Sequence, residues 1–304
     1  MTECERDSTV KPQFSVVIPV YNDWTPLGQC LESLERQTSA PGFEVIVVDD
    51  GSTEAAPEFV RPSVYGYPLS VIRQSHAGIP AARNRGIRAT KGAVLLFVDA
   101  DCKLDANCLA ALSSSIAESP QGDCFQLRLV GNCSNLVGRA EELRLITFQN
   151  HTLQADGRIR YLNTAGFAIR RARVNIETGV FDPVALRAED TLLLANLMQA
   201  GELPLFVPNA VVEHAIPLSL MACLRKDIRS VYLERKAYEI IASKRVRIRV
   251  SHGERLRLLS AMWKNAGQQA IGRSAWFVLV VRQTLQRTLS FGYQCLRAGS
   301  APSS

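Results

Sequence analysis

The sequence predicts an α/β protein whose core is a doubly wound sheet. Along the first half of the chain, short apolar runs rich in β-branched residues alternate with segments whose apolar residues recur at helix spacing. The order is strand, helix, strand, loop, strand, helix, strand. Because this alternation favours parallel strands with helices on both faces, we expect one open sheet. With 304 residues, 47% of them hydrophobic, the chain can bury a substantial core.

Four strands are expected in the first hundred residues. They are FSVVIPV (14–20), FEVIVVDD (43–50), PLSVIR (68–73) and AVLLFVD (93–99). Strands that are covered on both faces of a parallel sheet are mostly apolar along their whole length. We therefore expect all four strands to be buried and parallel.

Two helices are expected between these strands. In TPLGQCLESLERQ (25–37), Thr25 can cap the helix, Pro26 suits its first turn, and the leucines that follow repeat at helix spacing. The second helix is expected from about Pro80 to Ala89, closed near Gly92.

Polar residues follow three of the strands directly. The segments are PVYND (19–23), DDGST (49–53) and DADC (99–102). A turn would explain any one of them. However, ligands bind beyond the carboxyl ends of strands in such sheets, and carboxylates gathered there repel one another unless a cation or ligand offsets them. If the fourth strand stays extended, Asp99 and Asp101 face one ligand, and a hard divalent cation would let both sit beside a diphosphate.

Two common nucleotide-binding loops are absent from the sequence. The dinucleotide fingerprint G-x-G-x-x-G should follow the first strand, where PVYNDW stands instead. The phosphate-binding motif G-x-x-x-x-G-K-[ST] occurs nowhere. What remains is a nucleotide site built with carboxylates.

Several of these segments share their order and spacing with a known family. PVYND, VVDDGST, AARNRGIRATKG and FVDADC together resemble the donor half of the family 2 glycosyltransferases, of the bacterial, non-processive type. TAGFAIRR (164–171) and RAEDTLL (187–193) resemble the acceptor-side segments of the same family. The resemblance covers roughly residues 14–215. It implies the GT-A fold, which is a Rossmann-like doubly wound mixed sheet, and an inverting reaction.

The resemblance implies a donor site at the strand ends. The donor-binding residues that it implies are Pro19, Tyr21, Asn22, Asp50 and Asp99. The first three would line the nucleoside pocket, the fourth would contact the base, and the last would lie nearer the ribose and sugar.

A divalent metal is the implied cofactor, with Asp101 as the metal-binding member of the D-x-D motif. Oxygen ligands flanked by phosphates suit Mg²⁺ or Mn²⁺. His214, in VVEHAIP, resembles a position where some GT-A enzymes supply a metal or phosphate contact. A structural histidine is the alternative.

An acidic pair, Glu189 and Asp190, precedes a stretch that predicts a helix ending at Gly201. By itself the pair would be an acidic first turn favoured by the helix dipole. The resemblance assigns the general base to Asp190, because inversion needs a carboxylate that takes the proton of the acceptor hydroxyl. It places Glu189, Gly166 and Phe167 on the acceptor side.

Charge divides the chain into two regions. Residues 221–304 contain 16 Lys and Arg against 4 Asp and Glu, whereas residues 1–220 contain 19 against 25. The segments 218–245 and 274–296 combine apolar spacing with basic residues, as interfacial helices do. We expect this basic region to bind an anionic membrane; the alternative is that its helices pack on the catalytic domain. The apolar residues expected to enter the membrane are Trp276, Phe277, Leu279 and Val280.

Three regions are expected along the chain. They are a flexible N-terminus (1–13), a catalytic domain (14–215) with a donor half (14–102) and an acceptor half (103–215), and a basic helical extension (216–304).

The expected activity is transfer of a sugar from a nucleotide diphosphate sugar, with UDP-sugars as the first choice, to a saccharide or lipid-linked acceptor. Such a reaction would serve polysaccharide or glycolipid assembly. A nucleotide-sugar-binding, non-catalytic member of the fold stays open. So does, less favoured, a sugar nucleotidyltransferase, which would carry a glycine-rich basic loop after the first strand.

We expect the protein in the cytoplasm, where the basic region would attach it peripherally to the inner face of the cell membrane. The eight cysteines include no C-x-x-C pair, and no signal-like segment or apolar run of spanning length occurs. No nucleic-acid partner is expected.

Overall fold

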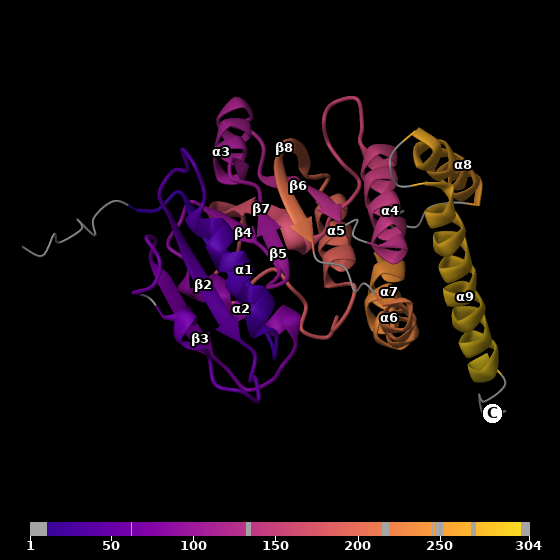
Figure 1. Ribbon diagram of the computed structural model, residues 1–304, viewed down its shortest axis with the longest axis horizontal. Helices are drawn as coiled ribbons and strands as arrows, with labels where there is room; N and C mark the ends of the chain where they lie inside the picture. Colours follow the sequence, from indigo (N-terminus) through magenta and orange to yellow (C-terminus); the bar gives the residue numbers. More distant parts are fainter. Residues whose placement is uncertain are drawn as a thin grey trace, which may run out of the picture.

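The computed structural model describes residues 11–61, 63–131, 135–214, 219–244, 246, 248, 252–268 and 272–298. These residues form one mixed eight-stranded sheet, in the order β3-β2-β1-β4-β7-β6-β8-β5, with helices around it (Figure 1). The strands are β1 (Phe14–Val20), β2 (Phe43–Asp49), β3 (Leu69–Arg73), β4 (Val94–Phe97), β5 (Cys102–Leu104), β6 (Cys124–Gly131), β7 (Phe167–Arg170) and β8 (Leu205–His214). The helices are α1 (Trp24–Glu35), α2 (Ile79–Ala89), α3 (Cys108–Glu118), α4 (Leu136–Thr152), α5 (Glu189–Gln199), α6 (Leu220–Leu233), α7 (Arg235–Ser243), α8 (His252–Gln268) and α9 (Arg273–Ala298).

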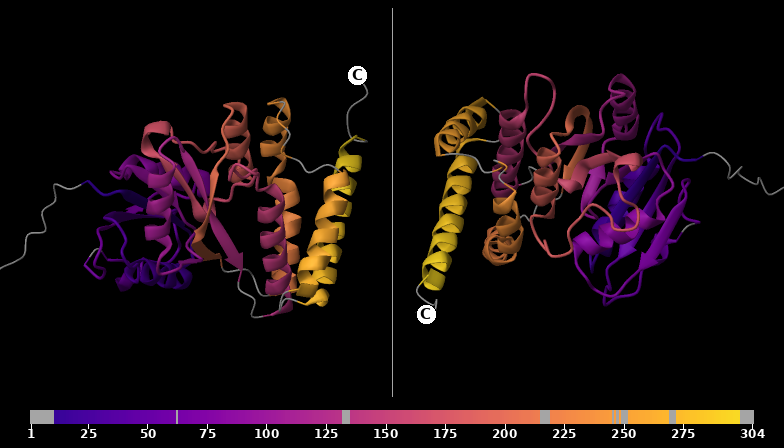
Figure 2. Two further views of the ribbon diagram at one scale, coloured as in Figure 1. Left: turned by 90° about the horizontal axis from the view of Figure 1, so that it is seen from above. Right: turned by 180° about the vertical axis from the view of Figure 1, so that it is seen from behind.

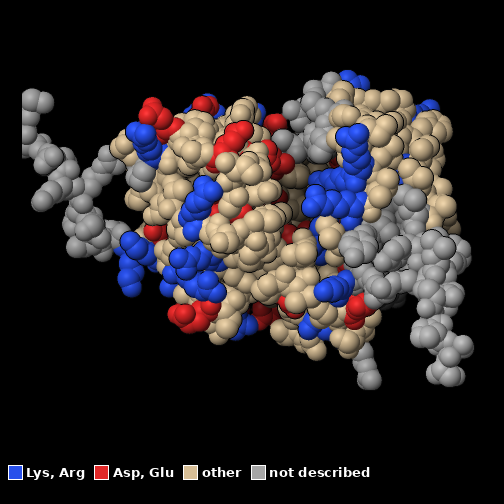
Figure 3. Space-filling model, turned by 90° about the horizontal axis from the view of Figure 1, so that it is seen from below, with Lys and Arg blue, Asp and Glu red and all other residues tan. Residues whose placement is uncertain are grey.

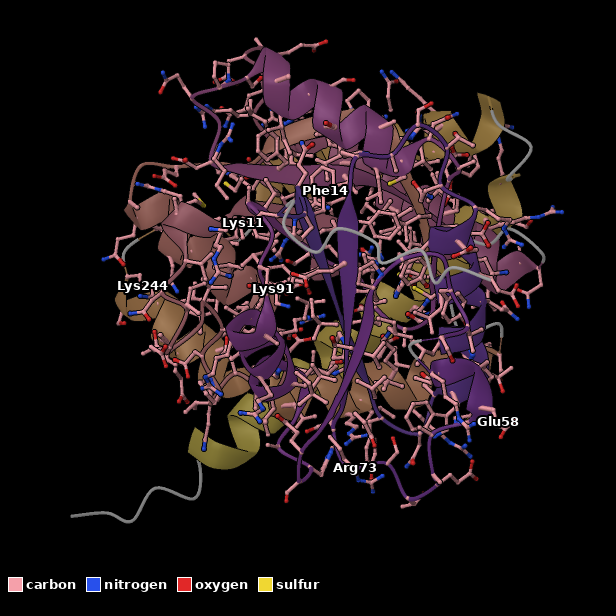
Figure 4. All side chains as sticks on the ribbon, turned by 90° about the vertical axis from the view of Figure 1, so that its left-hand side faces the viewer. Lys11, Phe14, Glu58, Arg73, Lys91 and Lys244 are labelled. Atoms are coloured by element: carbon pink, nitrogen blue, oxygen red, sulfur yellow. The ribbon has the colours of Figure 1, made fainter. Side chains whose placement is uncertain are left out.

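The first four strands confirm the predicted parallel sheet. β1 pairs in parallel with β2 and β4, and β2 pairs in parallel with β3. Figure 4 shows Phe14, which begins β1, and Arg73, which ends β3, toward opposite ends of the sheet. The carboxyl ends of these strands therefore lie at one edge. The expectation that all four are buried is wrong for β3, which is an edge strand with most of its side chains partly or fully exposed.

The remaining strands make the sheet mixed, as the GT-A resemblance implies. β7 runs antiparallel to β4 and β6, β8 runs parallel to β6, and β5 runs antiparallel to β8. The pairing of β5 with β8 places Cys102 opposite His214. Two residues that are more than a hundred positions apart in the sequence, Cys102 next to Asp101 and His214, thereby become neighbours.

Helices cover both faces of the sheet. α1 and α3 bury their apolar faces in the larger core cluster, and α2 and α5 pack in a second cluster on the other side. Gly86 allows α2 to approach β1 closely, because a Cβ there would lie 2.4 Å from Cγ1 of Val17. The helix ending near Gly201 is confirmed as α5, after which Gly201 adopts a positive φ of 77°.

Two local expectations are wrong. Thr25 lies inside α1, whose N-cap is Asp23, and the Asp23 side chain makes no capping bond. β4 ends at Phe97, so Asp99 and Asp101 lie in and beside a turn instead of on an extended strand. The turn ends at β5, which begins at Cys102 and closes onto β8.

The C-terminal helices form a layer beside the sheet, and α4 belongs to it (Figure 2). Ala140 and Leu143 of α4 pack with Met262 of α8 and Leu279 of α9. A boundary at residue 215 therefore separates α4 from the helices against which it packs. The expected helix over 218–245 is broken into α6 and α7 at Glu234. The expected flexible N-terminus lies outside the described residues for positions 1–10.

Within the part of the chain that the structure describes, no helix combines the length and the apolar character needed to cross a membrane.

Candidate active site

A cleft of about 1600 Å³ lies between the carboxyl edge of the sheet and the helical layer. The predicted residues that line it are Pro19, Tyr21, Asp50, Asp99, Asp101, Glu189, Asp190 and His214. Figure 3 shows this hollow from below, with Lys and Arg side chains gathered along its right-hand side, next to the helical layer. Most of the site residues that the sequence predicts therefore line one cleft.

Asp50 anchors the loop between β3 and α2. Its carboxylate accepts hydrogen bonds from the Gln74 side chain (2.7 Å) and from the backbone N–H groups of Ala77 (2.9 Å) and Gly78 (2.8 Å). Nδ1 of His76 lies 2.9 Å from the same carboxylate. The His76 ring in turn stacks on Tyr21, with ring centroids 4.2 Å apart. An aromatic pair at the mouth of the cleft is thus held in place by a buried carboxylate.

Asn22 connects two loops and does not line the cleft. Its backbone is left-handed (φ 54°), a conformation that Asn tolerates better than most residues. Its side-chain oxygen accepts from the backbone N–H of Thr53 at 2.8 Å, and its own N–H donates to Ser52 Oγ at 2.9 Å. Asn22 therefore bridges the loops after β1 and β2, and its contact with the nucleoside pocket stays a prediction.

Arg83 of α2 links the turn after β4 to the first turn of α5. Its guanidinium is buried, with 1% of the side chain exposed, and donates through Nη2 to Asp99 at 2.6 Å and through Nη1 to Glu189 at 2.7 Å. Glu189 is therefore held as the partner of an arginine. The contact fixes the turn after β4 relative to the first turn of α5.

Asp101 and His214 form the candidate metal site. Nε2 of His214 lies 3.4 Å from an Asp101 carboxylate oxygen, and this spacing suits two ligands of one ion. Burial raises the pKa of Asp101, but the hydrogen bond and charge of His214 and the charge of Lys226 outweigh it and leave that pKa lowered. Cys102 lies close to both residues, yet burial raises the pKa of its thiol well above the usual value. A protonated thiol is a poor ligand for Mg²⁺ or Mn²⁺.

Asp190 has the electrostatic properties of a general base. It lies in the first turn of α5, whose N-cap Ala188 adopts a left-handed backbone (φ 59°), and its Oδ1 accepts from the Thr191 N–H at 2.6 Å. Burial raises the pKa of Asp190 to about 7, and the charge of Glu189 adds to this. No described residue donates a hydrogen bond to its second oxygen. A carboxylate poised near neutral pH can accept a proton.

Gly166 and Phe167 lie beneath the site and not in it. Phe167 is fully buried and stacks on Phe97 of β4, with ring centroids 6.4 Å apart. The carbonyl of Gly166 accepts from the Gln126 side chain at 2.9 Å, and a Cβ at this glycine would lie 2.8 Å from Leu129. Neither residue lines the cleft, so the expected acceptor contact is corrected to a packing role.

The helical wall of the cleft is held by a buried ion network. Arg282 of α9 contacts Glu141 of α4 and lies 3.1 Å from Asp227 of α6. Burial alone would raise the pKa of Glu141, but the charges of Arg144 and Arg282 lower it to about 2. The carboxylate therefore stays ionised, and three helices meet at one guanidinium.

Sequence reasoning missed several residues that shape the cleft. His76 and Arg83 stand in segments that predict a loop and a helix, and Arg282 stands in an expected interfacial helix. The sequence signal for Arg83 is an arginine among small and apolar residues on the buried face of α2. No comparable signal marks His76 or Arg282, because their partners lie far away in sequence.

Comparison with known proteins gives the family. The model of the family described as "Glycosyl transferase family 2" matches residues 15–179. An uncharacterized glycosyltransferase, YibD, of Escherichia coli K12 is 40% identical over 90 residues, which is 29% of this chain and 26% of that protein. A PGL/p-HBAD biosynthesis glycosyltransferase of Mycobacterium bovis BCG is 36% identical over 116 residues, which is 37% of this chain and 44% of that protein. The matched segments thus span less than half of these relatives.

Solved structures share the fold at low sequence identity. The crystal structure of Staphylococcus aureus TarS 1-349 in complex with UDP covers 96% of this chain and 93% of its own, with a TM-score of 0.55 and 20% identity. The mannosyltransferase PcManGT of Pyrobaculum calidifontis, in complex with GDP-Man and Mn²⁺, covers 93% and 84%, with a TM-score of 0.58 and 18% identity. The fold is that of the GT-A glycosyltransferases. Because the family model matches more than half of its residues, this chain belongs to glycosyl transferase family 2.

Proposed function

We propose that this protein is an inverting, non-processive glycosyltransferase. It moves a sugar from a nucleotide diphosphate sugar, a UDP-sugar first of all, to a hydroxyl of a saccharide or lipid-linked acceptor. The observation that carries the proposal is that Asp190, with a pKa raised by burial to about 7, faces the same cleft as Asp101 and His214. A base and a metal-ligand pair in one cleft are what a direct displacement requires.

A divalent ion, Mg²⁺ or Mn²⁺, fits the residues at the donor end. Asp101 and His214 would hold it, since a carboxylate oxygen and an imidazole nitrogen lie 3.4 Å apart at the edge of the cleft. When bound, such an ion offsets the charge that develops on the diphosphate as the glycosidic bond breaks. The PcManGT neighbour is described in complex with Mn²⁺.

Each remaining step belongs to side chains of this protein. Tyr21 and His76 offer a stacking surface for the base of the donor, next to Asp50. Asp99, fixed by Arg83, faces the ribose and sugar. Asp190 takes the acceptor hydroxyl proton on its second oxygen as the acceptor oxygen attacks the anomeric carbon from the side opposite the nucleotide.

The test is a screen of the purified protein with Mn²⁺ against UDP- and GDP-sugars, in which release of nucleoside diphosphate is measured. We expect metal-dependent release with one donor class. Release that continues undiminished in EDTA and in the Asp101→Ala variant would refute the metal assignment.

Two other functions give different results in this screen. A non-catalytic binder would bind UDP with metal but release no product, and Asp190→Asn would change nothing. A sugar nucleotidyltransferase would consume a sugar phosphate and a nucleoside triphosphate. The loop after β1 disfavours it, because Asn22 ties this loop to Ser52 and Thr53 and no glycine-rich basic loop is present at that position.

We also propose peripheral attachment to the inner face of an anionic membrane, with the residues revised. Leu279 is buried against α4 and α8, and Trp276 is half-buried and donates to the Leu259 carbonyl at 3.0 Å, so both are engaged with protein. The outer face of α9 instead carries Phe277, Val281 and Leu285, which are 56%, 66% and 39% exposed. Their spacing of four residues places them along one stripe.

A further inference from the structure

The Tyr161 hydroxyl is buried next to the cleft without a hydrogen-bond partner. The residue lines the cleft and is 9% exposed, and its ring packs edge-on against Phe148 of α4, with ring centroids 5.7 Å apart. Within the described part of the chain, the hydroxyl makes no hydrogen bond of normal geometry. Asn163 lies close to it, but the side-chain oxygen of Asn163 already accepts from the Ala165 N–H at 2.9 Å. A buried hydroxyl in this condition costs free energy, so we expect it to gain a partner in another state of the protein.

Among the charged groups that act on this hydroxyl, Asp190 has a free acceptor atom. These groups are Arg144, Asp190 and Glu141. A guanidinium has no acceptor atom, and Glu141 is paired with Arg144 and with Arg282. The first oxygen of Asp190 accepts from Thr191, whereas its second oxygen receives no hydrogen bond from a described residue. A donor without an acceptor and an acceptor without a donor therefore belong to two residues that line the same cleft.

Packing turns these two residues toward each other. Leu162, which follows Tyr161, lies in the same apolar cluster as Leu193 and Leu194 of α5. These two leucines follow Asp190 by three and four residues in that helix, so they share its face. The face of α5 that carries Asp190 is therefore directed toward the segment that contains Tyr161.

The two groups differ in how they respond to pH. Burial raises the pKa of Tyr161 to about 12, so the hydroxyl keeps its proton near neutral pH. Burial and the charge of Glu189 raise the pKa of Asp190 to about 7, against the opposing effects of Thr191 and Arg83. A hydroxyl donates to an ionised carboxylate more strongly than to a neutral carboxyl. A hydrogen bond between the two residues is therefore strongest once Asp190 has lost its proton.

We propose that Tyr161 is a positioning residue for the base: as Asp190 ionises, the Tyr161 hydroxyl donates to its second oxygen and holds that oxygen at the cleft. The proposal rests on the proposed glycosyltransferase function, and it adds a residue that acts through Asp190. A carboxylate oxygen has two acceptor positions, so one takes the Tyr161 hydrogen bond and the other takes the proton of the acceptor hydroxyl. Tyr161 keeps its own proton throughout, and only the proton of the acceptor moves.

The test is urea unfolding of the full chain at pH 4.5 and at pH 8. At pH 4.5 Asp190 is protonated, so Tyr161→Phe removes a hydroxyl that has no strong partner and should change the midpoint little. At pH 8 Asp190 is ionised, so the same substitution removes a hydrogen bond to a charge and should lower the midpoint. The difference between the wild type and the variant should therefore grow as pH rises through about 7.

Tyr67→Phe is the matched control. Tyr67 is similarly buried, its hydroxyl donates to the Leu31 carbonyl at 2.9 Å, and it does not line the cleft. Because a carbonyl does not titrate, this variant should lower the midpoint by the same amount at both pH values. In an Asp190→Asn background, the effect of Tyr161→Phe should likewise be the same at both. The proposal is overturned if Tyr161→Phe alone has equal effects at the two pH values, or if its effect still grows with pH in the Asp190→Asn background.

A kinetic measurement separates this proposal from the function on which it rests. In the nucleotide-release assay, Tyr161→Phe should move the acidic limb of kcat/KM to higher pH by about one pH unit, because the carboxylate loses a donor that stabilises it. At pH 7 kcat/KM should fall roughly tenfold while the KM of the donor stays unchanged. A pH-dependent unfolding difference without turnover of any nucleotide sugar refutes the enzyme and leaves the pair. Turnover with the same acidic limb in both proteins refutes the positioning role and leaves the enzyme.

Discussion

Arg83 and Glu189 stand 106 residues apart in the sequence, yet Nη1 of Arg83 donates to Oε1 of Glu189 at 2.7 Å. The second nitrogen, Nη2, holds Asp99 at 2.6 Å. One buried guanidinium thus fixes the acidic turn after β4 relative to the first turn of α5, which contains the proposed base, Asp190. The residues proposed to bind the nucleotide sugar and the proposed base are therefore positioned relative to each other by these two ion pairs, although they lie far apart in the sequence.

Arg83→Met should strongly destabilise the protein. The substitution leaves Asp99 and Glu189 without their partner in a largely buried place, and removal of one member of such a network costs about 3–5 kcal/mol in free energy of unfolding. Urea unfolding followed by circular dichroism measures the loss. Arg85→Met is the matched control, since Arg85 is exposed on the same helix and its loss should change the midpoint little. Equal effects of the two variants would contradict the bridging role.

Asp190 should set the acidic limb of the rate profile. Because the base must be deprotonated, kcat/KM should rise with pH through about 7, the value to which burial and Glu189 raise the pKa of Asp190. Asp190→Asn should remove the limb and lower the rate roughly 10² to 10⁴-fold, with donor affinity unchanged. Glu189→Gln should move the limb to lower pH, because it removes the charge that raises this pKa. Equal loss of rate and donor binding in Asp190→Asn would indicate a structural role.

The same pKa predicts how stability depends on pH. A carboxyl whose pKa is raised on folding contributes stability at low pH, and this contribution is lost as pH rises from about 4 through about 7. Asp190→Asn should therefore gain stability relative to the wild type over this interval and show no gain at pH 4. Urea midpoints measured at pH 4.5, 6 and 8 give the comparison. A constant difference across the three values would contradict the raised pKa.

The sequence predicts the parts of the fold that local patterns determine. The parallel pairing of β1, β2, β3 and β4 follows from continuous apolar runs separated by helical spacing. Asp101 and His214 lie together because they follow or end strands whose carboxyl ends share one edge of the sheet, and Asp190 lines the same cleft from the first turn of α5. The roles of Asn22 and Phe167 depend on tertiary contacts that no local pattern encodes.

The place of α4 could not be predicted for a similar reason. It buries Glu141, Glu142 and Gln149 as well as apolar residues, so its sequence lacks a clear apolar face. Its partners are α8 and α9, which follow it by more than a hundred residues. Apolar contacts with these helices and long-range ion pairs, such as the one from Glu141 to Arg282, hold it in place.

Asp101 and His214 should contribute unequally to metal-dependent binding. Asp101→Ala should abolish transfer and reduce UDP affinity in Mn²⁺ by at least 10- to 100-fold, because even outer-shell partners of a metal have effects of this size. His214→Gln keeps a neutral side chain that can still act as a metal ligand, so it should weaken UDP binding in Mn²⁺ less. Titration of UDP with Mn²⁺ and again with EDTA measures both. Wild-type turnover in Asp101→Ala would contradict the assignment of the D-x-D motif.

Arg282 should hold the helical wall in place. Arg282→Met leaves Glu141 and Asp227 close together without their shared partner, so we expect a loss of about 3–5 kcal/mol in the free energy of unfolding. Lys264→Met, an exposed position on α8, is the control and should be nearly neutral. If Arg282→Met unfolds like the control, then α9 does not depend on this network.

The apolar stripe on α9 gives the last prediction, because it separates membrane binding from packing. Phe277, Val281 and Leu285 are exposed, so replacement of all three by Ser should change the thermal midpoint little. If the stripe enters lipid, the variant should lose affinity for anionic vesicles on the order of 100-fold, since each partly exposed side chain would contribute about 1 kcal/mol on burial.

Salt distinguishes the two contributions to this binding. Basic residues should make wild-type co-sedimentation with phosphatidylglycerol vesicles fall steeply as salt rises, whereas burial of the stripe should leave a remainder that salt does not screen. The triple variant should lack that remainder. Val184→Ser, an exposed apolar position in the catalytic half, is the control and should retain it. If the wild type ignores anionic vesicles, or if the triple variant unfolds several degrees earlier, the stripe is packed against protein and the membrane proposal is wrong.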